Sequence, residues 1–198
     1  MRFSDLGLQT QLLATLDELG YQTPTPIQQA AIPEVLAGRD VLAGAQTGTG
    51  KTAAFALPLI QRYLTDQSPH NAIRVLVLTP TRELAQQVHQ SFVAYSQDTG
   101  LRCVVAYGGA SINPQIEALK QGCEVMVATP GRLLELVIKE LIDLSTLQTL
   151  VLDEADRMLD MGFIIDIKRI LRHLPEERQT LFFSATFNDE VFALKNTL

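Results

Sequence analysis

Six short apolar runs, separated by stretches with helical periodicity, constrain the fold of this chain more than any other feature of its sequence. They are rich in Val, Leu, Ile and Cys and lie at 40–44, 74–79, 103–107, 124–129, 149–153 and 180–184. Strands without regular polar alternation are buried on both faces, as in a parallel sheet covered by helices. We therefore predict an α/β fold, with a mostly parallel central sheet and helices on both of its faces.

Helical periodicity fills the intervals between these runs. The clearest case predicts an amphipathic helix over 163–174, with apolar residues at Phe163, Ile164, Ile167, Ile170, Leu171 and Leu174. Ahead of the first run, one helix face is formed by Leu8, Leu12, Leu13, Leu16 and Leu19. A second helix begins within PTPIQQAAIPEVLAG and stops at Gly38, and the polar segment 65–72 predicts a surface loop.

Length and composition limit the organisation of the chain. With 198 residues, 46% of them apolar, it can bury one substantial core and leaves no room for a second domain. We therefore treat 1–198 as a single unit, with an N-terminal region over 1–38 and a core over 39–198.

The composition also argues against several classes of protein. The longest apolar run, 53–60, contains Pro58 and is far shorter than the roughly 18 residues of a membrane helix. The N-terminus lacks the apolar stretch of a signal peptide, so we expect a cytoplasmic protein without a membrane partner. The cysteines and histidines lack metal-site spacing. We therefore expect core thiols at Cys103 and Cys123, and surface or packing roles for His70, His89 and His173.

The net charge of −6, with an isoelectric point near 5.0, restricts how this chain can bind nucleic acid. Non-specific nucleic-acid binding usually depends on a broad positive face, which this composition does not supply. Any nucleic-acid contact must therefore be local.

The residues directly after each predicted strand are the candidates for chemistry, because ligands of parallel sheets bind beyond the carboxyl ends of the strands. Gly48 and Gly50 let backbone N–H groups surround a phosphate, Lys51 supplies a positive charge, and the helix that follows presents its positive end. The hydroxyl of Thr52 can bind Mg²⁺. The strict motif has Gly where this chain has Ala45, so the match is to the GxGKT end. The alternative is a glycine-rich turn before a core helix.

A cluster of carboxylates follows the fifth run, in the sequence DEAD at 153–156. If Asp153 lies at the same sheet edge as the glycine-rich loop, it can hold Mg²⁺ beside bound phosphates. Glu154, one residue further and directed differently, can orient a water that attacks the γ-phosphate or accept its proton. Asp156 is left for structural coupling. The alternative is that these acids only favour the positive end of a helix.

Two further runs end alike, in LTPTREL and ATPGRLL. In each, Thr then Pro is expected at the N-cap and first helical position, with an Arg two residues past the Pro. These helix starts are candidate sites for successive backbone phosphates of a nucleic acid, with close backbone approach added by the glycine pair after the third run. The residues concerned are Pro80, Thr81, Arg82, Gly108, Gly109, Thr129, Pro130, Gly131 and Arg132. Ordinary helix capping is the alternative.

Two more segments carry weaker signals. The last run ends in Ser184-Ala185-Thr186, which places small hydroxyl groups where Asp156 could reach them. In GYQTPTPIQ at 20–28, Tyr21 could stack on a nucleobase, and the amide of Gln28 offers both a donor and an acceptor, as reading an adenine edge requires. The alternative for this segment is a turn that caps a helix.

Together these segments resemble the first RecA-like domain of the DEAD-box RNA helicases. Seven stretches occur in that family's order: GYQTPTPIQ, AQTGTGKT, PTREL, GG, TPGR, DEAD and SAT. The resemblance implies a RecA-like P-loop NTPase domain in which 1–38 carries the family's Q motif. It also implies ATP and Mg²⁺ as cofactors and RNA as partner, bound through its backbone without sequence preference.

The resemblance assigns roles to individual residues. The implied ATP site comprises Phe3, Tyr21, Gln28, Ala45, Gln46, Thr47, Gly48, Thr49, Gly50, Lys51 and Thr52. Gln28 would select ATP over GTP, and Phe3, seventeen residues ahead of Gly20, would support the adenine pocket unless it is only a core residue. PTREL, GG and TPGR look like the RNA-backbone contacts, and SAT resembles the element that links the ATP state to unwinding.

In this family a second RecA-like domain supplies arginines that complete the ATPase site. The chain ends at Leu198, shortly after SAT, so we expect that domain to be absent and hydrolysis by this chain to be very slow. The main hypothesis is the ATP-binding half of an RNA helicase. The alternatives are a nucleotide-gated RNA clamp or assembly scaffold, and a small-molecule kinase or GTPase, which would leave GYQTPTPIQ unused.

Overall fold

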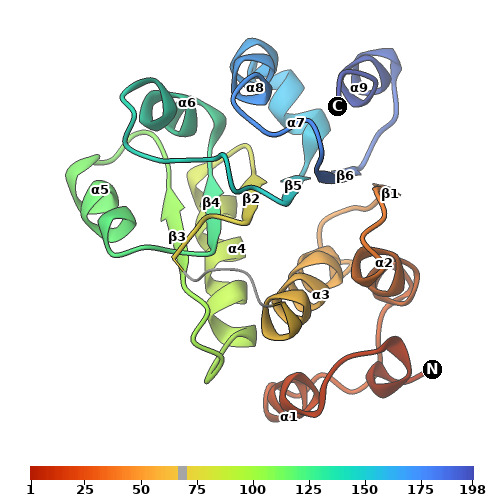
Figure 1. Cartoon of the computed structure of the whole chain (residues 1–198). Coiled ribbons are helices and arrows are strands. Elements are labelled where there is room, and N and C mark those ends of the chain that lie inside the picture. The colour runs from red at the N-terminus through yellow and green to blue at the C-terminus, as the bar shows by residue number, and fades with distance from the viewer. Residues whose placement is uncertain (67–70) are drawn as a thin grey trace.

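The computed structural model describes residues 1–66 and 71–198, and part of the predicted loop at 65–72, with His70, therefore lies outside the described residues. Within them, six parallel strands form one sheet in the order β1-β6-β5-β2-β4-β3 (Figure 1). The strands are β1 (Val41–Gly44), β2 (Val75–Leu78), β3 (Cys103–Ala106), β4 (Val125–Ala128), β5 (Thr149–Leu152) and β6 (Gln179–Ser184). Each lies within one of the six predicted runs except for Gln179, so the predicted α/β class is confirmed.

Helices cover both faces of this sheet (Figure 1). On one side lie a short 3₁₀ helix and four α-helices: η1 (Phe3–Leu6), α1 (Thr10–Glu18), α2 (Pro26–Leu36), α3 (Lys51–Thr65) and α4 (Arg82–Tyr95). On the other lie α5 (Asn113–Lys120), α6 (Pro130–Ile138), α7 (Ala155–Asp160), α8 (Ile164–Leu171) and α9 (Asp189–Lys195).

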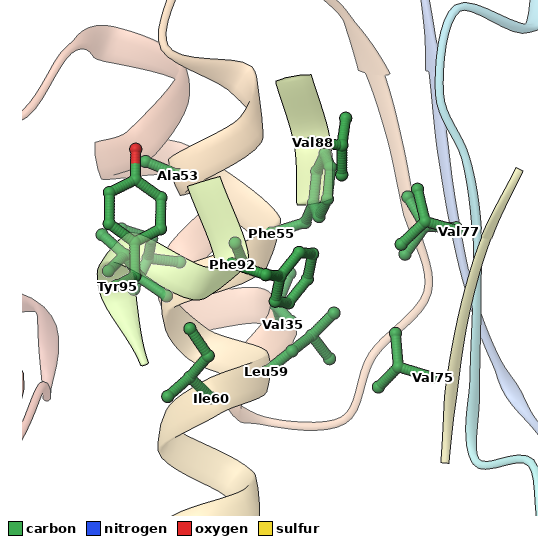
Figure 2. Close-up of a cluster of buried hydrophobic side chains, with 14 of the residues drawn as sticks. Val35, Ala53, Phe55, Leu59, Ile60, Val75, Val77, Val88, Phe92 and Tyr95 are labelled. Atoms are coloured by element: carbon green, nitrogen blue, oxygen red, sulfur yellow. The ribbon is translucent and has the colours of Figure 1, made fainter. Parts of the chain in front are cut away.

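Side-chain alternation along the strands divides the interior into two cores. In β2, Val75 and Val77 belong to the cluster under α1–α4, whereas Leu76 and Leu78 belong to the cluster under α5–α9. Figure 2 shows the two valines pointing toward Phe55 and Phe92, whose ring centroids lie 6.2 Å apart. The central strands β2, β4 and β5 are buried along their whole length and fill both cores, so they cannot alternate with polar residues, which explains their continuous apolar runs. The edge strand β1 is less buried, and its Leu42 is 46% exposed.

The helix predictions agree with the structure except at their ends. α2 ends at Leu36, followed by Gly38 in the left-handed conformation (φ +80°), as the predicted stop requires. The helix expected over 163–174 is α8, which is shorter because Phe163 is its N-cap and Arg172 its C-cap. Leu19 lies beyond α1 and is 40% exposed, so the apolar face of that helix is narrower than predicted.

In the part of the chain that the structure describes, none of the helices combines the length and the apolar character that crossing a membrane requires.

Candidate functional site

Parallel pairing brings the carboxyl ends of the strands to one edge of the sheet. Leu78 of β2 is in register with Leu152 of β5 and with Ala128 of β4, and Gly44 of β1 is in register with Ser184 of β6. The glycine-rich loop, the DEAD segment, PTREL and TPGR therefore start from the same edge. A cavity of about 530 Å³ opens there between the N-terminal region, the loop and α4.

The glycine-rich loop connects β1 to α3 and adopts a conformation that depends on two glycines. Gly48 and Gly50 have φ angles of +86° and +79°, a region that other residues rarely adopt. A Cβ atom on Gly50 would lie 2.5 Å from Nε2 of Gln28, whereas one on Gly48 would meet nothing within 4 Å. Within the loop the hydroxyl of Thr49 donates to the carbonyl of Gln46, at 2.7 Å.

Ala45 fixes the start of this loop to the sheet. Its N–H donates to the carbonyl of Ser184, at 3.0 Å, and its side chain is buried in the core beneath α3. The loop thus leaves the sheet beside β6, the strand that leads to SAT.

Lys51, at the first position of α3, lies between two buried carboxylates. Its Nζ is 2.8 Å from Oδ1 of Asp153 and 3.3 Å from Oε2 of Glu154, and all three side chains are at most 10% exposed. Burial raises the pKa of the Asp153 carboxyl above its ordinary value, an effect that the Lys51 ammonium opposes. Residues about a hundred positions apart in the sequence therefore share one electrostatic site.

The backbone at Glu154 explains why neighbouring carboxylates reach the same ammonium. Glu154 is the N-cap of α7 and has φ +55° and ψ +53°, a left-handed conformation that costs a non-glycine residue of order 1–3 kcal/mol. We had expected Glu154 to point away from the direction of Asp153. The turn instead brings its side chain toward the same ammonium group of Lys51. Its other oxygen lies 3.5 Å from Arg157.

The N-terminal region forms one wall of the cavity. Gln28 lies in the first turn of α2, where its side-chain oxygen accepts from the N–H of Thr25 (2.9 Å) and its amide nitrogen donates to the carbonyl of Gly50 (3.1 Å). The amide thus joins the helix cap to the glycine-rich loop, and part of its hydrogen-bonding capacity is used within the protein. Gln28 therefore takes part in capping α2, the alternative given for this segment, and it also lines the cavity.

Two aromatic residues accompany Gln28 at this wall. Tyr21 is 41% exposed, and its hydroxyl lies 3.0 Å from that of Tyr95 on α4. Phe3 lines the cavity but is only 5% exposed and also belongs to the core beneath α3, so its position is compatible with both roles that the sequence left open.

The opposite wall is formed by α4, which the motifs did not indicate. The lining residues are Leu84, Gln87, Val88, Ser91 and Tyr95. Their spacing of three or four residues places them on one helix face, a periodicity that the sequence contains. Periodicity alone does not show that this face meets a cavity, so only the structure identifies the wall.

The two Thr-Pro segments differ at their helix starts. Thr129 is the N-cap of α6 with Pro130 at its first position, as predicted. In the other segment the prediction was wrong by two residues, because Thr81 and not Thr79 is the N-cap of α4. Thr79 instead prolongs the strand, since its N–H donates to the carbonyl of Ala128 (3.0 Å).

The side chains at this end of the sheet are connected to one another. Arg82 is exposed and lies over the ring of Tyr107, with Cζ 5.0 Å from the ring centroid. Gly108 and Gly109 are exposed, and the N–H of Gly108 donates to the hydroxyl of Thr129 (3.2 Å). Arg132 is 9% exposed at its side chain, so it lies inside the protein and not on the surface.

The SAT segment contacts the DEAD segment as expected. The hydroxyl of Thr186 donates to Oδ2 of Asp156, at 3.2 Å. The hydroxyl of Ser184 donates to the carbonyl of Thr186, at 2.7 Å, so it shapes the segment without reaching Asp156 itself.

The described residues contain no group of three or more His, Cys, Asp or Glu side chains that could hold a metal ion. Mg²⁺ does not need such a group, because it usually binds one or two carboxylates together with substrate phosphates and water. Asp153, a buried carboxylate beside the glycine-rich loop, fits that mode of binding.

The sheet is all-parallel within the described residues, and its first strand leads through a glycine-rich turn into a helix that begins with Lys-Thr. This arrangement is that of a RecA-like domain of the P-loop type. A family model described as "DEAD/DEAH box helicase" matches residues 25–194. The chain belongs to the DEAD/DEAH box helicase family.

Individual relatives agree with this assignment. The RNA helicase CrhR of Synechocystis sp. is 50% identical over 194 residues, which cover 98% of this chain and 39% of that protein. The ATP-dependent RNA helicase DeaD of Escherichia coli is 49% identical over 96% of this chain and 30% of its own length. The crystal structure of a DEAD box protein from the hyperthermophile Methanococcus jannaschii matches 99% of this chain and 53% of its own, with a TM-score of 0.91 and 38% identity. The chain thus spans between 30% and 53% of these three relatives.

Proposed function

We propose that this chain is the ATP-binding half of an RNA helicase, which couples the binding and hydrolysis of Mg-ATP to RNA binding and local duplex unwinding. One observation carries the proposal: Lys51 of the glycine-rich loop and Asp153 of the DEAD segment meet at 2.8 Å in the wall of a cavity large enough for a nucleotide.

The N-terminal wall would bind the base. Tyr21 offers a partly exposed aromatic face, and Gln28 retains one amide N–H and one acceptor position beyond its contacts with Gly50 and Thr25. An adenine edge needs one donor and one acceptor, which this remaining capacity matches. Phe3 would support the pocket from the core side.

The loop would bind the phosphates. The N–H groups of residues 46–50 and the start of α3 favour negative charge, and Lys51 would pair with phosphate oxygens in place of the two carboxylates. Asp153 and the hydroxyl of Thr52 would hold Mg²⁺, which supplies charge neutralisation at the β- and γ-phosphates when bound. Glu154 would orient the attacking water or accept its proton.

RNA would bind at the neighbouring part of the same edge. PTREL, the glycine pair and TPGR offer two helix starts, an exposed Arg82 and two exposed glycines. These features suit successive backbone phosphates and explain how a chain with a net charge of −6 could bind RNA.

The relatives named above extend well beyond this chain. We propose that a second RecA-like domain completes the ATPase site with arginines, whose contribution to the rate is about 10³ to 10⁵. This chain by itself would then hydrolyse ATP very slowly. Strong RNA-stimulated turnover by the isolated chain would contradict this part of the proposal.

Nucleotide selectivity tests the proposal as a whole. In titrations with fluorescent ATP and GTP analogues in the presence of Mg²⁺, the chain should prefer ATP, and Gln28→Ala should abolish most of that preference. Equal affinity for both nucleotides in the unmodified chain would instead favour a general P-loop enzyme such as a small-molecule kinase.

A nucleotide-gated RNA clamp remains the second candidate, because Glu154 serves hydrolysis while the RNA-facing residues lie on other elements. Glu154→Gln in a chain joined to its second domain separates the two. Loss of turnover with intact RNA binding and intact cellular function would favour the clamp, whereas loss of function would favour unwinding.

A further inference from the structure

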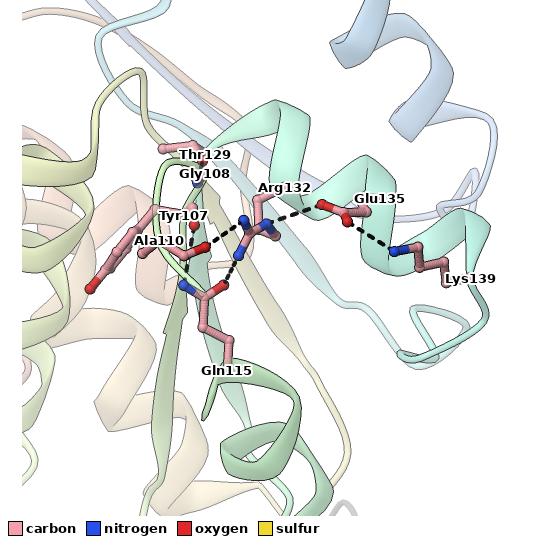
Figure 3. A network of polar contacts seen from close by, with 8 residues as sticks. All are labelled: Tyr107, Gly108, Ala110, Gln115, Thr129, Arg132, Glu135 and Lys139. Atoms are coloured by element: carbon pink, nitrogen blue, oxygen red, sulfur yellow. Dashed lines mark hydrogen bonds and ion pairs between the residues drawn. The ribbon is translucent and has the colours of Figure 1, made fainter. Parts of the chain in front are cut away.

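Arg132, the arginine of TPGR, is held by contacts within the protein (Figure 3). One terminal nitrogen donates to Oε1 of Gln115 at 2.7 Å, and the other donates to the carbonyl of Ala110 at 2.9 Å. The remaining nitrogen, Nε, lies 3.1 Å from a carboxylate oxygen of Glu135. Two of the three guanidinium nitrogens therefore donate to acceptors in the protein, whereas Nε is paired with Glu135 by charge without a hydrogen bond, and the side chain is 9% exposed.

Gln115, on α5, is the residue that this arrangement depends on. Its side-chain oxygen accepts from Arg132, and its amide nitrogen donates to the carbonyl of Tyr107, at 3.1 Å. Because an arginine can only donate and a carbonyl can only accept, these partners fix the orientation of the amide. Gln115 is 8% exposed, so leaving either end of it without a partner would be costly.

The two carbonyls held in this way flank the exposed glycine pair. Tyr107 precedes Gly108, and Ala110 follows Gly109, which has φ +80°. The N–H of Gly108 is in turn held by the hydroxyl of Thr129. The glycine turn is thus fixed before, within and after the glycine pair by side chains from α5 and from the start of α6.

The same contacts extend to PTREL through Tyr107. While its carbonyl binds Gln115, its ring lies under Arg82, and its hydroxyl accepts from Nε2 of Gln86 on α4, at 3.1 Å. The position of Arg82 therefore depends on the backbone that Gln115 holds.

We propose that Gln115 and Arg132 are positioning residues for RNA binding. They hold the Gly108–Gly109 turn and Tyr107 in the shape that receives an RNA phosphate, and Arg132 acts through this turn instead of contacting a phosphate itself. This inference rests on the proposed function. It makes Arg82, which is exposed, the arginine of these two segments that would contact an RNA phosphate directly.

The test measures how the chain binds a labelled uridine oligonucleotide by fluorescence anisotropy over a range of salt concentrations. Gln115→Leu should weaken binding about tenfold, as the loss of a buried hydrogen-bonding residue predicts, without changing the salt dependence. Gln90→Leu, at an exposed glutamine on α4, is the matched control and should bind like the unmodified chain. Thermal unfolding and ATP affinity should be unchanged in the control.

Salt dependence separates positioning from direct contact. Removing a phosphate contact lowers the slope of log affinity against log salt by about 0.7 for single strands. Arg82→Gln should show this decrease, whereas Arg132→Gln should lose affinity with an unchanged slope. The double variant Gln115→Leu with Arg132→Gln should bind no more weakly than Arg132→Gln alone, because both changes release the same turn.

Three results would overturn the proposal. The first is a Gln115→Leu variant that binds RNA as well as Gln90→Leu does, and the second is a decrease in salt slope for Arg132→Gln equal to that for Arg82→Gln. The third is an unmodified chain that binds no RNA even at low salt, which would remove the RNA-binding part of the proposed function as well. If Gln115→Leu does not fold, Gln115→Glu replaces it: this variant keeps the acceptor for Arg132 and loses the donor to Tyr107, and undiminished RNA affinity would reject the role of Gln115.

Discussion

Two cationic residues near helix starts at the same sheet edge, Lys51 and Arg132, have opposite relations to their surroundings. Lys51 lies in a cavity wall against two carboxylates, of which Asp153 is a candidate ligand of Mg²⁺. Arg132 donates to a side-chain amide and a backbone carbonyl, both of which belong to the fold itself. A buried cation whose partners are themselves candidate ligands can change partners, whereas one whose partners are structural cannot do so cheaply.

The comparison shows that a motif position alone does not determine how a charged residue acts. By sequence, both residues are cations next to a candidate phosphate site. Burial does not separate them, because each side chain is 9% exposed. Only the identity of their partners distinguishes a candidate ligand-binding residue from one that shapes the neighbouring surface. We expect substitutions on the Lys51 side to affect nucleotide binding and substitutions on the Arg132 side to affect RNA binding.

The largest expected effect is that of Lys51→Ala on triphosphate affinity. Removing one member of a buried charge pair typically costs enough to reduce affinity about a hundredfold or more. Calorimetry with ATP and Mg²⁺ should show this loss, while Lys120→Ala, at an exposed lysine paired with Glu117, should retain full affinity. Unchanged ATP affinity in Lys51→Ala would remove the main support for the nucleotide site.

A smaller effect is expected from the two loop glycines, which differ in their surroundings. Either substitution by Ala strains a positive φ, at a cost of roughly 1–2 kcal/mol. Gly50→Ala adds a clash with Gln28 and Thr25, so it should weaken ATP binding clearly more than Gly48→Ala, whose new methyl group meets nothing within 4 Å. Equal losses in the two variants would mean that the contact between Gln28 and the loop does not matter for binding.

Much of this architecture could be predicted from the sequence. Continuous apolar runs are required by a sheet that fills two cores, and they indicated all six strands within the described residues. The position of the candidate site was predicted from the rule that parallel sheets bind ligands beyond the carboxyl ends of their strands. Because Lys51 and Asp153 each follow a strand, this rule predicted that they lie close together. The strand order β1-β6-β5-β2-β4-β3 could not be derived from the runs themselves, because their spacing contains no information about which strands are neighbours.

The remaining features depend on contacts that local sequence does not specify. The left-handed turn at Glu154 and the wall formed by α4 arise from tertiary packing. The burial of Arg132 depends on Gln115, seventeen residues away on another helix. The misplaced N-cap at Thr79 shows the same limit, since the N–H of Thr79 donates to the neighbouring strand and the helix begins two residues later than predicted.

Thr129→Val should produce a moderate effect on the RNA side alone. The substitution keeps the shape of the side chain and removes the hydroxyl that accepts from the N–H of Gly108. Because this amide is part of the glycine turn, RNA affinity should fall about fivefold, near the value of one neutral hydrogen bond. ATP affinity should not change. A variant that loses ATP affinity as strongly as RNA affinity would show that the two regions are not separable.

The smallest effect is expected from Tyr95→Phe on the nucleotide side. The pKa of the Tyr95 hydroxyl is raised, mainly because the group is buried, so the hydroxyl stays neutral. It pairs with the hydroxyl of Tyr21 at 3.0 Å. Removing it should free the Tyr21 ring and weaken ATP binding about two- to threefold, because the pair is partly exposed and the ring contact with residue 95 remains. RNA affinity without nucleotide should be unaffected, and Tyr63→Phe, at a tyrosine on α3 that does not line the cavity, serves as the control. If Tyr95→Phe and Tyr63→Phe bind ATP with the same affinity, the hydroxyl pair does not position Tyr21, and the base-binding wall is held by packing alone.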